Sequence, residues 1–162
     1  MAMISLSAFA GDWSIPAPKA TAFVAGDSLY MWNIGGQGFL SNGEAWGTQA
    51  IVSKTNGVVF QWKATETEGV YKSANLYGTD KYLFRTHDGK AGSECSAMFV
   101  DGGDNKNNYE ITAIEGNKYL IHMSNFDTDA DEYDPNLYLG YWPENPNSVF
   151  YNESGITYGI WY

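Results

Sequence analysis

Short apolar runs, separated by turn-forming residues, make up most of the chain. No stretch repeats apolar residues at helical spacing over three turns. Asn-Gly, Asp-Gly and Gly-Gly pairs recur among the 18 glycines and supply tight turns between the runs. Aromatic residues make up 16% of the chain and favour strands over helices. The pattern therefore predicts an all-β protein, and 162 residues are enough for one domain.

Aligning the chain with itself gives three copies of one strand pattern. Each copy opens with an expected strand, at Leu29–Asn33, Val70–Asn75 and Tyr119–Met123. An aromatic-Leu pair follows in each copy, at Phe39-Leu40, Tyr82-Leu83 and Tyr138-Leu139. A third strand comes next, at Gln49–Ser53, Ala97–Asp101 and Ser148–Tyr151. Each copy closes on a further apolar strand, at Phe60–Trp62, Tyr109–Ile111 and Gly159–Trp161.

The spacing of the copies is regular. Their last large apolar residues, Trp62, Ile111 and Trp161, lie 49 and 50 positions apart. One copy alone is too small to bury a stable core, so the three must share one. We expect a domain over residues 28–162 with approximate threefold symmetry, divided into repeats 28–68, 69–116 and 117–162.

The threefold spacing and the Phe60-Gln61-Trp62 strand resemble the β-trefoil family, and within it the ricin-B-type carbohydrate-binding modules of secreted bacterial proteins. In that family each copy ends in a Gln-x-Trp-like strand. The resemblance spans Asp27 to Tyr162 and implies a β-trefoil with a lectin-like function. A β-sandwich is the competing all-β fold, but it leaves the regular period unexplained.

The N-terminus indicates export. Residues 1–10 are apolar and end in the small-x-small pattern Ala8-Phe9-Ala10, which we interpret as the remnant of a truncated signal peptide. An ordinary hydrophobic start is the alternative. Residues 11–27 contain Pro16 and Pro18 and are interpreted as a linker. This predicts a secreted, periplasmic or cell-surface protein, and no run is long enough to predict membrane insertion.

Charge and cysteine content exclude several classes of partner. The formal net charge is −10 and Arg85 is the only arginine, so nucleic acid and anionic membranes are not expected partners. Cys95 is the only cysteine, which rules out an internal disulfide bond.

The resemblance implies shallow sugar pockets near the hairpin loops. The first copy offers Asn42, Trp46 and Gln49, and the third offers Tyr141, Trp142, Asn145 and Asn147. A ring face stacks on the C–H face of a sugar, and planar amides bind adjacent hydroxyls. The alternative is structural: Trp46 packs over the barrel, Asn42 forms the turn, and Tyr141 and Trp142 cap the core.

An acidic loop in the third copy has carboxylates at alternate positions, Asp127, Asp129 and Asp131. Oxygen ligands with this spacing resemble the start of a calcium loop. Glu132 and Tyr138 replace the glycine and the bidentate glutamate that such a loop requires. A solvated acidic loop is the alternative, and we expect no required cofactor.

The sequence carries no catalytic motif. His87 and His122 lie in different copies, and no nucleophile elbow or phosphate-binding loop is present. We expect a non-enzymatic module that binds a glycan or polysaccharide, beside or within a larger host polypeptide or enzyme. The alternative function is a protein-interaction, protease-inhibitor or structural spacer module.

Overall fold

The computed structural model describes residues 22–43, 48–85, 95–101, 108–125, 137–143, 149–152 and 158–162. These residues form twelve β-strands and no helix, which confirms the predicted all-β class. In chain order the strands are β1 (Trp32–Asn33), β2 (Gly38–Gly43), β3 (Gln49–Ser53), β4 (Phe60–Ala64), β5 (Val70–Leu76), β6 (Lys81–Arg85), β7 (Cys95–Asp101), β8 (Asn108–Ile114), β9 (Lys118–Asn125), β10 (Leu137–Tyr141), β11 (Val149–Asn152) and β12 (Ile160–Trp161).

Alternating burial explains why these segments are strands. In β3, Ala50 and Val52 are buried while the residues on either side of them are partly exposed. Phe60 and Trp62 of β4 are buried on either side of the half-buried Gln61. Both strands therefore turn one row of apolar side chains inward.

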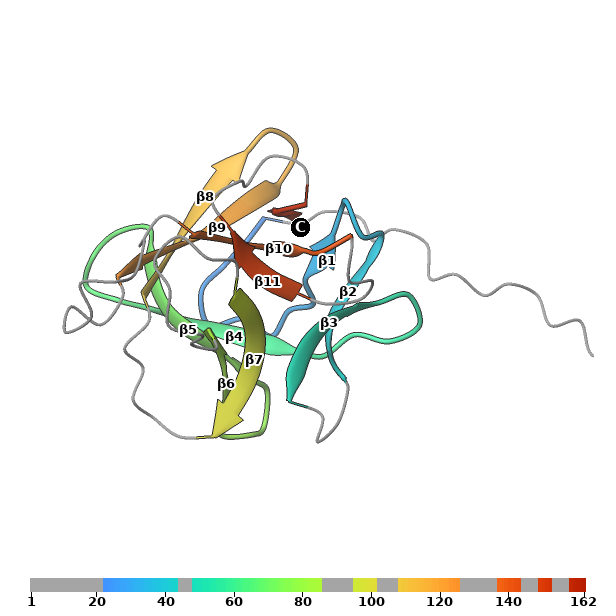
Figure 1. The fold of residues 1–162 in the computed structure, drawn as a ribbon. Coiled ribbons are helices and arrows are strands. Elements are labelled where there is room, and N and C mark those ends of the chain that lie inside the picture. The colour runs from blue at the N-terminus through green and yellow to red at the C-terminus, as the bar shows by residue number, and fades with distance from the viewer. Residues whose placement is uncertain are drawn as a thin grey trace, which may run out of the picture.

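Six strands form a nearly closed, barrel-like antiparallel ring (Figure 1). They pair in the order β4, β5, β8, β9, β12 and β1. The two ends of the ring approach where Leu29, just before β1, pairs with Phe60 of β4. Their two backbone hydrogen bonds measure 3.0 and 2.9 Å.

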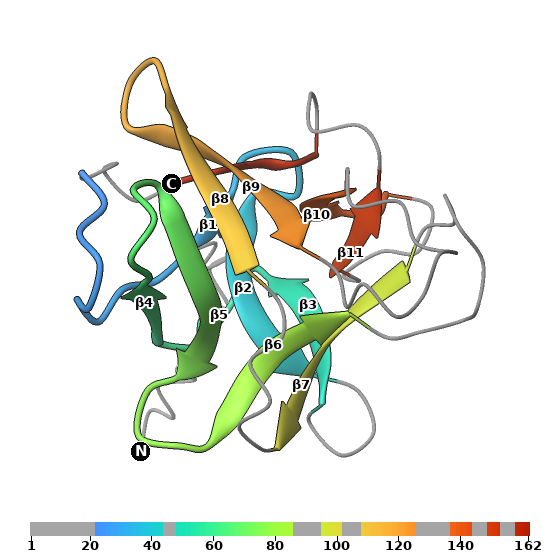
Figure 2. The same ribbon diagram turned by 90° about the vertical axis from the view of Figure 1, so that its left-hand side faces the viewer.

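The other six strands form three hairpins, β2–β3, β6–β7 and β10–β11. Each hairpin is attached to the ring in the same way, because β2 pairs with β1, β6 with β5, and β10 with β9. The hairpins also pair with each other through β3–β7 and β7–β11, and Figure 1 shows β3, β7 and β11 side by side. The view in Figure 2 shows β4, β5 and the β8–β9 hairpin along one wall of the ring.

Matching residues of the three hairpins fill the core. Leu40, Leu83 and Leu139 are each 0% exposed. Their cross-strand partners in register are Val52, Phe99 and Tyr151. The aromatic-Leu pairs that the sequence singles out therefore occupy corresponding positions in β2, β6 and β10.

Buried rings with polar atoms have hydrogen-bond partners in this core. Trp161 Nε1 donates to the carbonyl oxygen of Leu139 at 2.9 Å. The Tyr109 hydroxyl donates to the carbonyl oxygen of Leu83 at 3.4 Å. Aromatic side chains of β12 and β8, two strands of the barrel-like ring, are thus hydrogen-bonded to the backbone of two matched leucines in the hairpins.

The expected strand positions agree closely with the structure. The predicted third strand Gln49–Ser53 coincides with β3, and Ala97–Asp101 lies within β7. Two differences stand out: β8 continues to Ile114 rather than ending at Ile111, and β1 begins at Trp32 rather than at Leu29. Leu29 forms only an isolated bridge to Phe60, so the ladder between them does not extend into a longer strand.

Candidate binding sites

The end of the β2–β3 hairpin holds two of the predicted sugar-binding residues. Gly43 pairs with Gln49 and Asn42 pairs with Ala50, so the hairpin brings Asn42 and Gln49 within one residue of each other. Asn42 is exposed and Gln49 is half-buried. Side chains alternate along a strand, which directs these two amides to opposite faces of the hairpin. Trp46, in the loop between them, lies outside the described residues.

The third-copy cluster begins at the end of β10. Tyr141 is half-buried, packs against the core and meets the ring of Tyr158 at 6.1 Å between centroids. Its backbone N–H donates to the carbonyl oxygen of Tyr158 at 2.9 Å. A Cβ added to Gly36 would lie 3.0 Å from Tyr141 Cγ, so this ring packs on the turn after β1. These contacts give Tyr141 a structural role.

Trp142 follows Tyr141 and is half-buried. The remaining predicted members of this cluster, Asn145 and Asn147, lie outside the described residues. Asn42 and Tyr141 occupy matching hairpin positions, because each lies two residues after a matched leucine and is paired in register, with Ala50 and Val149 respectively. The structure therefore places the described members of the two predicted clusters at the ends of different hairpins.

Asp127, Asp129 and Asp131, the predicted calcium ligands, also lie outside the described residues. In the part of the chain that the structure describes, no three His, Cys, Asp or Glu side chains gather in a way that could hold a metal ion. His122 lies in β9, with Nδ1 3.4 Å from Glu110 Oε2 and its ring centroid 4.8 Å from that of Tyr138. His122 is thus packed between its neighbours on the wall of the ring.

An open groove of about 800 Å³ lies beside the β4–β5 turn and β8. Its lining includes Glu66, Lys72, Asn108 and Glu110, together with threonine, valine and alanine side chains. None of these lining residues is aromatic. The described lining of this groove therefore offers no ring on which a sugar could stack.

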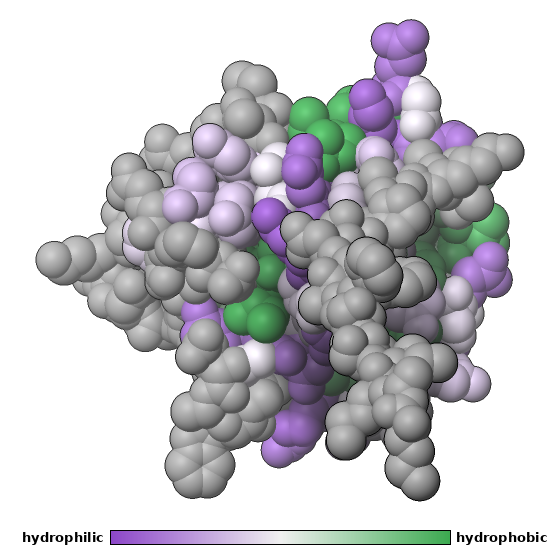
Figure 3. Space-filling view, turned by 90° about the vertical axis from the view of Figure 1, so that its right-hand side faces the viewer, coloured by the Kyte–Doolittle hydropathy of each residue, from purple (hydrophilic) through white to green (hydrophobic). Residues whose placement is uncertain are grey.

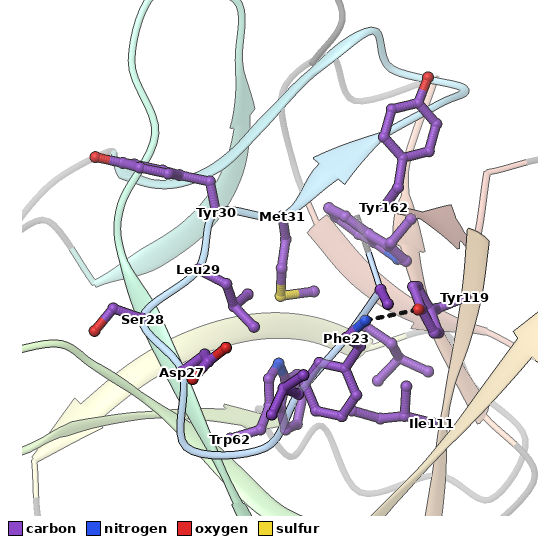
Figure 4. A pocket seen from close by; sticks show the side chains of 14 residues that line it. Phe23, Asp27, Ser28, Leu29, Tyr30, Met31, Trp62, Ile111, Tyr119 and Tyr162 are labelled. Carbon is purple, nitrogen blue, oxygen red and sulfur yellow. Dashed lines mark hydrogen bonds between the residues drawn. The ribbon is translucent and has the colours of Figure 1, made fainter. Parts of the chain in front are cut away.

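A cavity of about 140 Å³ lies at the end of the ring, beneath residues 22–28 (Figure 4). Phe23 spans it: its backbone N–H donates to the Tyr119 hydroxyl at 2.8 Å, and its ring meets Tyr71 edge-on at 5.0 Å. A cavity of this size accepts about one benzene-sized molecule. The described part of the predicted linker thus packs against the strand ring. We interpret the cavity as a feature of this packing rather than as a binding site.

The Tyr119 hydroxyl is expected to anchor this N-terminal segment. Replacing Tyr119 with phenylalanine should lower the free energy of unfolding by about 1 kcal/mol, because the Phe23 N–H loses its partner. It should also accelerate amide hydrogen exchange at Phe23. Tyr77→Phe, which alters an exposed hydroxyl, serves as the control. Unchanged exchange at Phe23 in Tyr119→Phe would show that the segment is held by other contacts.

Two exposed aromatic residues were missed in the sequence analysis. Tyr30 is 55% exposed and Tyr77 is 59% exposed, although both lie in or beside predicted strands. For Tyr30, the alternation of side chains along a strand could have predicted this exposure, because Leu29 and Met31 face inward and Tyr30 lies between them. On the face shown in Figure 3, by contrast, the described hydrophobic residues lie in small patches separated by hydrophilic ones.

No protein-family model and no curated protein matches this chain. Within the described ranges, no helix has the length and apolar character needed to cross a membrane.

Proposed function

We propose that the chain is a β-trefoil built from three four-stranded repeats. One pairing scheme supports this proposal in all three repeats: a ring strand is followed by a hairpin, as in β1–β2–β3, β5–β6–β7 and β9–β10–β11. The matched burial of Leu40, Leu83 and Leu139 adds to it. A β-sandwich has two separate sheets, whereas these strands belong to one twelve-stranded sheet.

On this fold we infer a non-catalytic carbohydrate-binding module. The observation that supports the inference is that two described candidates, the amide Asn42 and the ring Trp142, lie at hairpin ends. Asn42 is exposed at the end of β2, next to the loop that contains Trp46, and Trp142 follows β10. An amide can both donate to and accept from neighbouring sugar hydroxyls, while an indole face covers the C–H groups of the sugar.

The expected ligand is neutral. With a net charge of −10, the protein repels polyanionic chains, whereas uncharged sugars experience no such repulsion. The signal-peptide interpretation of residues 1–10 adds a secreted, periplasmic or cell-surface location to the proposal. A module of this kind acts by holding a glycan near a host polypeptide.

Substitution of the two tryptophans tests this function. Trp46→Ala and Trp142→Ala should each weaken binding to an immobilised neutral polysaccharide about tenfold, because loss of a stacking ring removes about 1.4 kcal/mol. Thr112→Ala, at an exposed position in β8, is the control and should bind as the wild type does. Thermal melting of each variant separates lost binding from lost folding. Wild-type affinity in both tryptophan variants would contradict the proposed site.

A further inference from the structure

The walls of the ring contain a row of inward-facing residues on three adjacent segments. Leu29 exchanges both backbone hydrogen bonds with Phe60, and Phe60 is also paired in register with Leu76 of β5. Phe60 and Leu76 are buried, and Leu29 packs against the core. The next residue on each segment must then point outward, because side chains alternate across a sheet.

The outward-facing row is Tyr30, Val59 and Tyr77. Continuing the register by one residue places Tyr30 and Tyr77 on opposite sides of Val59. The Tyr77 backbone N–H donates to the Val59 carbonyl oxygen at 2.8 Å, so the pairing reaches this row. Tyr30 and Tyr77 are 55% and 59% exposed, and Figure 4 shows the Tyr30 side chain pointing away from the cavity.

The spacing of the two tyrosines follows from the strand geometry. Adjacent strands lie about 4.8 Å apart, so Tyr30 and Tyr77, one strand apart on each side of Val59, start about 10 Å from each other. The Tyr30 ring is held in place by an edge contact with Phe39, at 5.8 Å between centroids. Gly57 allows this packing, because a Cβ there would lie 2.8 Å from Phe39 Cβ and 3.0 Å from Tyr30 Cδ1.

We propose that Tyr30 and Tyr77 form a platform for an extended, neutral, β-linked glycan chain. The inference rests on the proposed function, since it names the class of glycan and adds a second binding face. Successive sugar units in an extended chain repeat at a distance close to the strand spacing. Of three consecutive sugar units, the first and third can therefore each cover one tyrosine, while the second lies over Val59.

The chemistry of the platform favours a sugar chain over a protein partner. A stable protein interface buries about 800 Å² on each partner and has a contiguous apolar centre. Here the two rings are separated by the half-buried Val59, and Val24 is the only other large hydrophobic residue exposed among those the structure describes. The polar turn at Ser53, Thr55 and Asn56 directly precedes Gly57, where an added Cβ would lie 3.0 Å from Tyr30 Cδ1.

Titration with soluble β-1,4-linked glucan, xylan and chitin pentasaccharides, and with the corresponding monosaccharides, tests the platform. At least one pentasaccharide should bind the wild type, and its monosaccharide should bind far more weakly. Tyr30→Ala and Tyr77→Ala should each weaken pentasaccharide binding about tenfold, as expected for loss of one stacked ring. Tyr77→Phe should retain most of the binding, because it keeps the ring. Val24→Ala, at another exposed apolar position, is the matched control.

The outcomes separate this inference from the proposed function. Unchanged pentasaccharide binding in the Tyr30→Ala/Tyr77→Ala double variant, together with weakened binding in Trp46→Ala, overturns the platform and leaves the proposed function intact. If no neutral glycan binds the wild type, both are overturned. Loss of binding in the double variant with an unchanged melting temperature supports the platform, because both tyrosines are exposed and contribute little to stability.

Discussion

Replacing Trp161 with alanine is expected to lower the free energy of unfolding by about 3–5 kcal/mol, the range for removing a large aromatic side chain from a core. Trp161 is 1% exposed and belongs to the central core cluster. It pairs in register with Asn33 of β1 and Tyr119 of β9, so it sits where three ring strands meet. Its Nε1 also donates to the Leu139 carbonyl oxygen at 2.9 Å.

A second substitution at this position separates packing from hydrogen bonding. Trp161→Phe retains a ring but leaves the Leu139 carbonyl oxygen without this donor, which should cost about 1–3 kcal/mol. Urea denaturation followed by tryptophan fluorescence and circular dichroism gives both values. A loss below 1 kcal/mol in Trp161→Ala would mean that β12 does not close the core as described.

Replacing Asn33 with alanine is expected to cost about 2–4 kcal/mol, because it leaves the Gly36 N–H without its partner and removes one of the two donors to the Tyr158 carbonyl oxygen, which keeps the Tyr141 N–H. Asn33 is 0% exposed. Its Nδ2 donates to the Tyr158 carbonyl oxygen at 2.7 Å, and its Oδ1 accepts a hydrogen bond from the Gly36 N–H at 2.7 Å. One amide thus ties the turn after β1 to the segment before β12.

Asn56→Ala supplies the matched control for this prediction. Asn56 is an exposed amide in the turn after β3, and its loss should cost less than about 1 kcal/mol. Amide exchange measured at Gly36 should rise sharply in Asn33→Ala and remain unchanged in Asn56→Ala. Equal stability of the two variants would contradict the role assigned to Asn33.

The strand positions could be predicted because local patterns determine them. Leu40, Leu83 and Leu139 each follow an aromatic residue directly and face inward, and turn pairs mark where strands stop. The hydrogen bonds of Asn33 could not be predicted in the same way. They connect positions 125 residues apart in one case and depend on how the ring closes.

The candidate binding residues could be predicted only in part, for a similar reason. Proximity in sequence suggested that Asn42 and Gln49 act together, but the register assigns them to opposite faces of one hairpin. The exposure of Tyr30 and Tyr77 depends on the pairing of three segments through Phe60. A single strand pattern shows that Tyr30 faces outward, but it does not show which ring lies beside it.

Screening the wild-type chain against a broad glycan array tests the central claim, carbohydrate binding, most directly. The array should include neutral β-linked chains of several lengths and polyanionic chains such as heparin. We expect saturable binding to neutral glycans, displaced by the same glycan free in solution, and no binding to the polyanions, which the net charge of −10 disfavours. The absence of binding to every neutral glycan, by a chain whose folding is verified by its melting transition, would contradict the account.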